Sequence, residues 1–305
     1  MPNEMNNILT LENDAAVETQ KSKEDLIWHE ITNAYRTRRI LTGMLGGIEK
    51  LEGGATITIV YYKNSRVVIP ITEMMINLVE DATHNYGELS LRQNKIVNTM
   101  LGCEIDFIIK GLDNKERSIV ASRKDAMLKK RQIFYFDQDS SGTPKVYPDR
   151  VVQARVISVA EKVVRAEIFG VETSIPARDL SFDWLGDARE RFHVGDHILV
   201  RIQEVKAENP EHISVQADVK SVEGDTSKAN LALCKVQGKY AGTVEDIHNG
   251  TVFVRLQIGV NAIAHTCYDS RTVGKKDEVS FVVTHIDSER NVALGIITRI
   301  IRQNL

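Results

Sequence analysis

The chain has 305 residues, more than the roughly 100–200 residues of a typical single domain, so we expect two or three domains. Its formal net charge of −3 argues weakly against a protein that coats DNA without specificity. No apolar run approaches the roughly 18–20 residues of a membrane span, and the polar N-terminus lacks the basic and apolar regions of a signal peptide. We therefore expect a cytoplasmic protein with no membrane partner.

The N-terminal residues predict a tail followed by one helix. Residues 1–21 are polar and without period, which is typical of a disordered segment. From Ser22 the sequence SKEDLIWHEITNAYRTRR has an N-cap residue, early acids and late arginines, which predict an amphipathic helix. The apolar positions at helical spacing are Leu26, Ile27, Ile31, Ala34 and Tyr35. We expect Trp28 to pack on the following domain rather than to stack on a base.

A pattern of five short strands follows this helix, up to about residue 136. Its third strand ends with VVIP at Val67–Pro70, its fourth begins at Gly102, and RSIVASRKDA closes its fifth. Between strands three and four the sequence predicts a helix at Thr72–Asp81 and then a polar loop. The residues of that helix expected to cover the core are Met74, Met75, Leu78 and Val79. After strand five, RKDAMLKKRQIFYF predicts a helix, and the turn-rich segment 137–150 predicts a linker.

The same pattern recurs twice more along the chain. A small residue followed by two apolar residues opens the first strand of each copy, at Gly43, Ala154 and Gly242. The first three strands of the last copy are expected at Tyr240–Ile247, Thr251–Leu256 and Val260–His265. Three copies of one supersecondary unit are far more specific than any single copy, and they indicate a repeat architecture.

The segments RSIVASRKDA, SIPARDL and FHVGDHILVRI resemble the ribosomal S1 RNA-binding domain family, and the resemblance extends over roughly residues 40–300. It implies a mainly β fold with short helices, in which three tandem five-stranded OB-type barrels bind single-stranded RNA. The expected parts are the tail at 1–21, the helix and first barrel at 22–136, a linker at 137–150, the second barrel at 151–223, a linker at 224–236 and the third barrel at 237–305.

The third barrel keeps two positions at which the family contacts RNA. The resemblance assigns Phe253 to the second aromatic of strand two and His265 to the end of strand three. It also shows departures, because Gly250 stands at the first aromatic position and Asn291 at the usual arginine of strand five. Further candidate contacts are Tyr240, Arg255 and Arg290. For Phe253 a place in the core stays equally open, and Arg255 is open to being a solvated strand residue.

The first barrel has Pro70 in place of the histidine but carries more positive charge. Its second strand ends in YYKNSR, which places Tyr61 or Tyr62 beside Lys63 and Arg66, and strand alternation lets only one tyrosine face outward. We include Tyr62, Lys63 and Arg66 among the candidate RNA contacts. The helix after strand five adds Arg123 and Lys124 as candidate phosphate contacts, with a solvated charged face as the alternative.

The second barrel has no aromatic on strand two, which reads KVVRAEI, and no basic surplus. Arg178 matches the basic position of the family's PARDL segment. Phe182 and Trp184 follow that segment and are expected to cap a groove or to close the barrel bottom. We therefore expect this barrel to be mainly structural or to contact protein.

No sequence feature indicates catalysis. The chain lacks a phosphate-binding GxxxxGK[ST] loop, HExxH and GxSxG, and its three cysteines form no CxxC pair, so we expect no enzyme, no cofactor and no metal. The leading hypothesis is a non-catalytic protein that binds single-stranded RNA and acts on mRNA or at the ribosome, with the ribosomal small subunit as a candidate partner. Two alternatives stay open, a protein-binding scaffold of degenerate barrels and a protein that binds single-stranded DNA.

Overall fold

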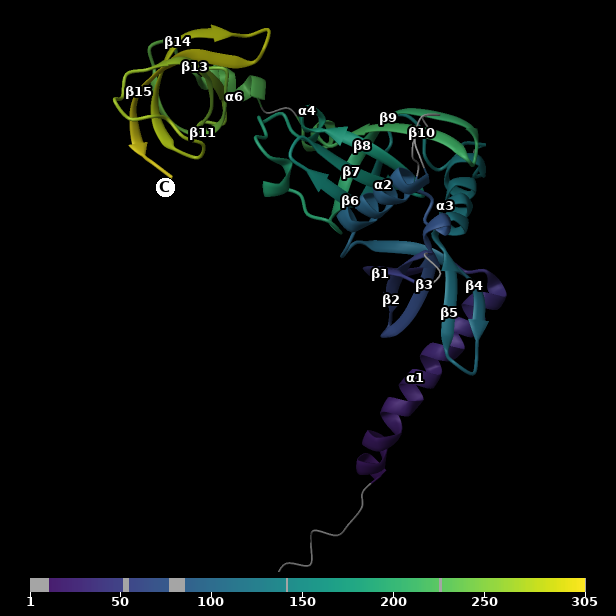
Figure 1. The fold of residues 1–305 in the computed structure, drawn as a ribbon. Helices are drawn as coiled ribbons and strands as arrows, with labels where there is room; N and C mark the ends of the chain where they lie inside the picture. The colour runs from purple at the N-terminus through teal and green to yellow at the C-terminus, as the bar shows by residue number, and fades with distance from the viewer. Residues whose placement is uncertain (1–10, 52–54, 77–85, 141, 225–226, 305) are drawn as a thin grey trace, which may run out of the picture. The chain divides into compact units, whose positions relative to one another are not determined.

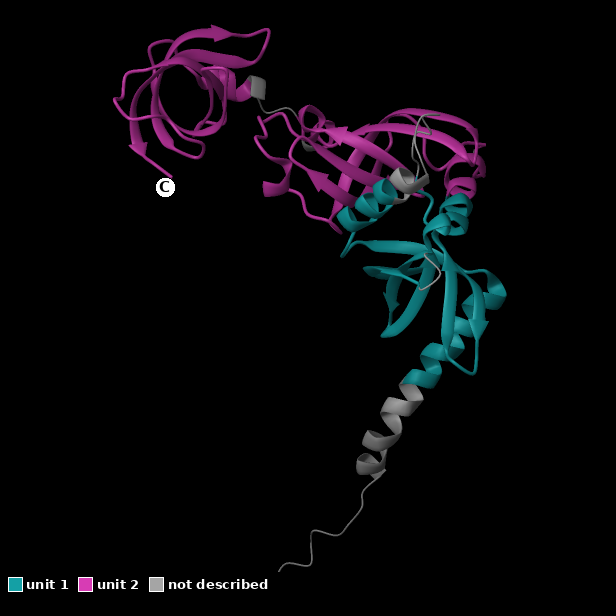
Figure 2. Cartoon of the chain, in the orientation of Figure 1, with its two compact units in different colours: residues 1–130 teal, residues 131–305 magenta. Residues whose placement is uncertain are grey.

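The computed structural model describes residues 11–51, 55–76, 86–140, 142–224 and 227–304. The chain divides into two compact units, Met1–Lys130 and Arg131–Leu305, which Figure 2 shows in different colours. The described part contains three five-stranded sheets, one in the first unit and two in the second. The mainly β fold with tandem five-stranded barrels that the sequence predicts is confirmed.

The first unit holds a closed barrel with strand order β1-β2-β3-β5-β4. Its strands are β1 (Leu41–Lys50), β2 (Thr56–Tyr62), β3 (Ser65–Pro70), β4 (Glu104–Asp113) and β5 (Ser118–Ser122). All neighbours pair antiparallel except β3 and β5, which pair parallel and close the barrel. A Cβ on Gly43 would lie 2.8 Å from the backbone oxygen of Tyr61 on β2. This close approach explains why strand one opens with so small a residue.

Helix α1 (Leu11–Thr37) precedes this barrel and begins eleven residues before the expected N-cap at Ser22. Ile31 and Ala34 are fully buried, whereas Leu26 and Tyr35 are exposed, so only part of the expected apolar stripe faces the barrel. The guanidinium of Arg117, between β4 and β5, lies 5.9 Å from the ring centre of Trp28. Trp28 therefore packs on the first barrel, as the sequence predicts.

The connection between β3 and β4 differs from the expected helix at Thr72–Asp81. The structure has a short 3-10 turn η2 (Ile71–Glu73) and a helix α2 (Tyr86–Thr99), the latter where a polar loop was expected. Met75 has a backbone φ of 54°, a left-handed conformation that a helix through residues 74–76 does not allow. Met74 is fully buried, as expected for core cover, while Leu78 and Val79 lie outside the described residues.

The helix expected after strand five is confirmed as α3 (Arg123–Arg131), and it continues as a π-helical turn η3 (Gln132–Phe136). The segment 137–150, expected to be a polar linker, packs on the second barrel. Its Val146 is 2% exposed in the core of that barrel, and its amide donates to the backbone oxygen of Phe134 at 2.9 Å. The hydroxyl of Tyr135 donates to the backbone oxygen of Ile168 at 2.7 Å.

The second barrel is a five-stranded sheet with order β10-β9-β6-β7-β8. Its strands are β6 (Val151–Ala160), β7 (Val163–Ile168), β8 (Val171–Pro176), β9 (His197–Asn209) and β10 (His212–Asp218). The edge strands β8 and β10 are linked by the hydroxyl of Thr173, which donates to the backbone oxygen of Val215 at 2.7 Å. A short helix α4 (Ala177–Leu180) follows β8, and a 3-10 turn η4 (Ala188–Glu190) precedes β9.

The third barrel is closed, with strand order β11-β12-β13-β15-β14 (Figure 1). Its strands are β11 (Lys239–His248), β12 (Thr251–Leu256), β13 (Asn261–Cys267), β14 (Glu278–Asp287) and β15 (Val292–Arg302). The first three agree with the sequence prediction to within two residues at each end. Helices α5 (Lys220–Glu223) and α6 (Ser227–Leu233) lie between the second and third barrels in the chain. Leu231 of α6 is buried against the core of the third barrel.

Candidate nucleic-acid interface

The outer face of β12 and β13 carries the residues that the sequence assigns to RNA. Val254 and Leu256 point into the core, so the residues that alternate with them, Phe253 and Arg255, point outward. Phe253 pairs with Ile263, and Arg255 pairs with Asn261, across the two strands. His265 is exposed at the end of this face, 3.3 Å from the hydroxyl oxygen of Thr251 through Nδ1. Phe253 therefore belongs to the surface of its own barrel rather than to its core.

A loop of the second barrel binds this face. The ring of Trp184 meets the ring of Phe253 edge to face, with centroids 4.9 Å apart. The carboxylate of Asp183 lies 2.6 Å from the guanidinium of Arg255. The side-chain amide of Asn261 donates to the backbone oxygen of Phe182 at 3.0 Å. We call the contact between these two barrels the seam.

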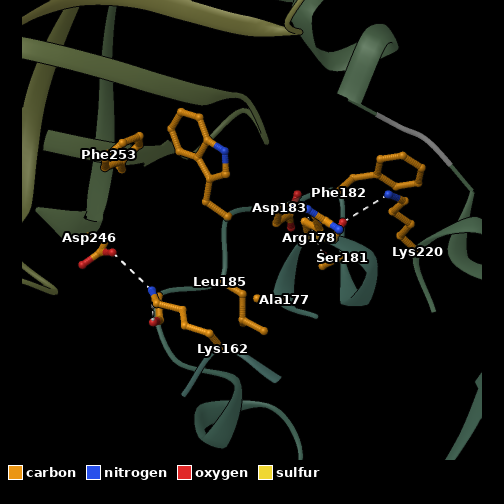
Figure 3. Close-up of a pocket in the computed structure, with 12 residues that line it drawn as sticks. Lys162, Ala177, Arg178, Ser181, Phe182, Asp183, Leu185, Lys220, Asp246 and Phe253 are labelled. Atoms are coloured by element: carbon orange, nitrogen blue, oxygen red, sulfur yellow. Dashed lines mark hydrogen bonds and ion pairs between the residues drawn. The ribbon is translucent and has the colours of Figure 1, made fainter. Parts of the chain in front are cut away.

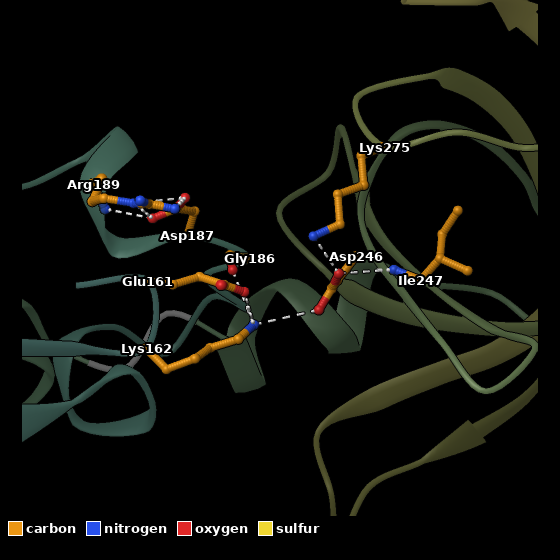
Figure 4. A network of polar contacts seen from close by, with 8 residues as sticks. All are labelled: Glu161, Lys162, Gly186, Asp187, Arg189, Asp246, Ile247 and Lys275. Atoms are coloured by element: carbon orange, nitrogen blue, oxygen red, sulfur yellow. Dashed lines mark hydrogen bonds and ion pairs between the residues drawn. The ribbon is translucent and has the colours of Figure 1, made fainter.

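A network of charges extends the seam beyond the loop (Figure 4). Lys162, between β6 and β7, donates to the backbone oxygen of Gly186 at 2.9 Å and to the carboxylate of Asp246 on β11 at 3.4 Å. Lys275 contacts the same carboxylate at 2.7 Å. Partial burial opposes ionisation of Asp246, but the hydrogen bond from Lys275, the backbone amide of Ile247 and the charges of both lysines keep its pKa below the ordinary value. Asp246 is therefore ionised at neutral pH and joins the two barrels.

Backbone packing also contributes to the seam. A Cβ on Gly186 would lie 2.6 Å from the backbone oxygen of Glu245, so this position of the loop has room only for glycine. A further ion pair joins Lys276 of the third barrel to Glu190 of the second at 2.7 Å. The contact is thus built from an aromatic pair, three ion pairs and close backbone packing.

The remaining candidates of the last two barrels divide into engaged and exposed side chains. The hydroxyl of Tyr240 accepts a hydrogen bond from the backbone amide of Lys235 at 2.9 Å, and its ring covers Gly238, so this tyrosine folds onto its own chain. Arg178 is 85% exposed and lies 3.8 Å from Asp179. Arg290, in the turn between β14 and β15, is similarly exposed and lies 3.8 Å from Asp287.

In the first barrel the structure decides between the two tyrosines of β2. Tyr61 is 52% exposed, whereas Tyr62 is 8% exposed and meets Phe107 edge to face in the core. The ring of Tyr61 lies across Gly46 on β1, where a Cβ would be only 2.2 Å from its Cε2 atom. Gly46 therefore leaves room for an aromatic ring lying against the backbone, with part of its surface open to solvent. Of the two tyrosines, Tyr61 is thus the one that faces outward, and the candidate contact Tyr62 lies in the core.

Tyr62 and Lys63 are held by one carboxylate. Glu30 of α1 accepts a hydrogen bond from the Tyr62 hydroxyl at 2.8 Å and lies 2.5 Å from Lys63 and 2.9 Å from Arg39. The hydrogen bonds from Lys63 and Tyr62 keep the pKa of Glu30 below its ordinary value. Burial, followed by the bond to Glu30, raises the pKa of Tyr62. The ion pair of Lys63 with Glu30 therefore connects the β2–β3 turn to helix α1.

The other basic candidates of the first barrel differ in exposure. Arg123 is fully buried and donates to the backbone oxygen of Met74 at 3.0 Å, so the expectation that it lies on an exposed basic face is corrected. It stabilises the irregular segment after β3 instead. Lys124 is exposed on α3, and Arg66 is exposed on β3, 2.5 Å from Glu49.

Sequence reasoning missed four residues that contact candidate side chains or join the last two barrels: Glu30, Gly46, Asp183 and Lys162. No local pattern marks them, because each acts on a residue at least 15 positions away in the chain. Trp184 was noticed as an aromatic after the PARDL segment. That Trp184 contacts Phe253 is evident only from the structure.

Within the residues that the structure describes, no group of three or more His, Cys, Asp or Glu side chains is placed to hold a metal ion. Among the same residues, no helix is long and apolar enough to cross a membrane.

Comparison with known proteins finds similarity to the family that the sequence repeats resemble. Residues 145–213 match the S1 RNA binding domain. The small ribosomal subunit protein bS1 of Coxiella burnetii is 21% identical over 91% of this chain and 47% of its own length. The bS1 protein of Neisseria meningitidis is 21% identical over 91% of this chain and 46% of its own length.

The chain thus spans about half the length of the curated relatives it matches. A multidomain protein with nucleic acid binding domains from Streptococcus pneumoniae covers 85% of this chain and 73% of its own, with 10% identity and a TM-score of 0.20. The second barrel matches the S1 RNA binding domain, and the chain as a whole resembles the S1 proteins of the bacterial small ribosomal subunit.

Proposed function

We propose that this chain is a non-catalytic protein that binds single-stranded RNA through its tandem S1-like barrels. The resemblance to the bS1 proteins supports RNA binding and an association with the ribosomal small subunit. It also supports a place in the cytoplasm, where ribosomes act. The barrels would act together, because weak sites on one chain gain avidity when they engage one strand.

The observation that carries the proposal is the Tyr61 ring. It lies across Gly46, is half exposed, and stands opposite Arg66 in the β2–β3 register. Single-stranded nucleic acids bind to flat aromatic rings next to cationic side chains, and stacking of one base contributes roughly 1–3 kcal/mol. The surface formed by strands two and three is the side on which OB-type barrels bind oligonucleotides. Tyr61 therefore has the exposure, support and neighbours of a base-stacking residue.

We retain as RNA contacts the exposed candidates other than Lys63, which is 51% exposed but is held by Glu30. They are Tyr61, Arg66, Lys124, Arg178, His265 and Arg290. The side chains engaged within the protein are Tyr62, Lys63, Arg123, Tyr240, Phe253 and Arg255. This division predicts that RNA contacts lie in both units, with one aromatic platform in the first.

Binding of a fluorescent oligouridylate to the full chain tests the proposal. We expect the affinity to fall steeply with salt, because phosphate contacts release counterions with a slope of roughly −0.7 per contact on single strands. Tyr61→Ala should weaken binding about tenfold, as expected for loss of one stacked base. Tyr147→Ala removes another exposed tyrosine, outside the retained contacts, and should leave binding unchanged. Absence of binding at low salt, or equal affinity of both variants, would contradict the proposal.

The seam favours one alternative, a protein-binding scaffold, because Phe253 and Arg255 are used here for a protein contact. Under that alternative the full chain binds no RNA at any salt concentration. Single-stranded DNA is the other alternative ligand. A competition between RNA and DNA of one sequence separates these two ligands.

A further inference from the structure

A cavity of about 430 Å³ lies beside the loop that forms the seam (Figure 3). Its wall includes three cationic side chains, Lys162, Arg178 and Lys220, and three aromatic ones, Phe182, Trp184 and Phe253. Phe253 comes from the third barrel, and the other five come from the second barrel and the segment after it. Pockets of roughly 300–1,000 Å³ hold small molecules in proteins, so the space has the size of a ligand site.

The charges around the cavity favour an anion. Its two acidic wall residues are both neutralised, Asp183 by Arg255 at 2.6 Å and Asp246 by Lys275 at 2.7 Å. Lys220 contacts Asp179 at 2.8 Å. Arg178 is the most exposed of the cavity's three cationic side chains, and its Nε lies 3.8 Å from Asp179. Its guanidinium is therefore the group best placed to donate hydrogen bonds to a phosphate, because only the 3.8 Å contact with Asp179 competes for it.

An apolar wall with aromatic rings beside a solvated guanidinium matches the chemistry of a nucleotide. We propose that the cavity at the seam binds one nucleotide, with its base against the aromatic wall and its phosphate on Arg178. The nucleotide belongs to an RNA strand that the chain binds, so this inference rests on the proposed RNA-binding function. A free nucleotide has the same chemistry and is the other source.

The seam also explains why a strand would bind here. The loop already contacts Phe253, Arg255 and Asn261, which belong to the outer face of β12 and β13 in the third barrel. A strand that reaches this barrel while the seam is formed meets the cavity at the edge of the loop. RNA binding and contact between the two barrels then support each other, since the site needs both.

Tryptophan fluorescence reports on this site directly. The chain has two tryptophans, and Trp28→Phe leaves Trp184, in the cavity wall, as the single one. We expect saturable quenching of Trp184 when this variant is titrated with an oligouridylate of about ten nucleotides. Quenching by uridine monophosphate alone assigns the site to free nucleotides, and quenching by the oligonucleotide alone assigns it to a strand. Quenching by neither overturns the proposal.

Two substitutions test the residues of the site in the full chain. Arg178→Ala should raise the Kd for the oligonucleotide about three- to tenfold and reduce the salt slope by about one contact. Lys206→Ala removes the same charge from the far part of β9, where the side chain is 66% exposed, and should change neither quantity. Equal behaviour of the two variants overturns the assignment of Arg178.

Trp184→Ala distinguishes a cavity that binds a nucleotide from a loop that covers an RNA site. If the cavity binds a nucleotide, loss of Trp184 weakens RNA binding without a change in charge. Tighter binding would show that the loop covers an RNA site instead, and it overturns the proposal.

Failure of the cavity is distinguishable from failure of the proposed function. In the first case Tyr61→Ala still weakens RNA binding while Trp184→Ala does not, and in the second case the unaltered chain binds no RNA.

Discussion

Trp184 of the second barrel and Phe253 of the third meet edge to face, with ring planes at 90° and centroids 4.9 Å apart. Phe253 occupies the position at which the S1 resemblance predicts a base-stacking aromatic. The structure shows that a protein ring occupies one side of it. The face of the third barrel that carries Phe253 is therefore partly covered by the second barrel.

We predict that Trp184 and Phe253 are energetically coupled. Aromatic pairs in this geometry contribute about 0.5–1.5 kcal/mol beyond the area they bury. A double-mutant cycle with Trp184→Ala and Phe253→Ala, read from urea unfolding, should give a coupling free energy in this range. Additive effects of the two substitutions would show that the rings do not interact in solution.

We predict that Gly186→Ala opens the seam. Its new Cβ would lie 2.6 Å from the backbone oxygen of Glu245, which belongs to strand β11 and has little freedom to move. In a Trp28→Phe background, the emission of Trp184 should shift to longer wavelength as water reaches its ring. Gly111→Ala adds a Cβ that meets nothing within 4 Å and should leave the emission unchanged.

Two adjacent glycines on β1 give a sharp test of the Tyr61 platform. Gly46→Ala adds a Cβ 2.2 Å from the Tyr61 ring and forces the ring to move, whereas a Cβ on Gly47 meets nothing within 4 Å. We expect Gly46→Ala to weaken RNA binding about as much as Tyr61→Ala does, although Tyr61 is still present. Gly47→Ala should bind RNA normally in the same titration with fluorescent oligouridylate. Normal RNA binding by Gly46→Ala would contradict the role of the Tyr61 ring in base stacking.

Glu30 should stabilise the first unit in a pH-dependent way. Its pKa in the folded chain is below the ordinary value of 4.5, because of hydrogen bonds from Lys63 and then Tyr62. A carboxyl with a lowered pKa adds stability above its unfolded pKa and loses that contribution as the pH falls through its folded pKa. Glu30→Gln should therefore cost about 1 kcal/mol at neutral pH, since the partners are partly exposed.

Urea unfolding at several pH values measures this contribution. The difference between Glu30→Gln and the unaltered chain should shrink as the pH falls below 4.5. Glu24→Gln is the control, because Glu24 is 64% exposed and lies 3.8 Å from Arg117. A Glu30→Gln variant as stable as the Glu24→Gln variant at neutral pH would contradict the role of Glu30.

The repeated pattern was sufficient to predict the strands, because alternation and turn residues are local properties, and the resemblance to the S1 family then implied the barrels. Contacts between distant residues decided the rest. Alternation alone could not choose between Tyr61 and Tyr62, since the outward partner Gly46 and the inward partner Phe107 lie on other strands. The buried state of Arg123 depends on the irregular segment after β3, which periodicity also failed to predict.

The seam shows the same limit for the candidate site. Phe253 and Arg255 were candidate RNA contacts from the sequence, and Trp184 was expected to cap a groove or to close the barrel bottom. The contacts of Trp184 with Phe253 and of Asp183 with Arg255 join different barrels, about 70 residues apart, and no local pattern encodes them.

Photo-crosslinking of the full chain to labelled oligouridylate, followed by mapping of the crosslinked peptides, tests the central claim most directly. We predict crosslinks to the peptide that contains Tyr61 and to the peptide that contains Trp184. Crosslinks confined to peptides outside both regions, or no crosslinks at low salt, would contradict an RNA interface built on these two sites.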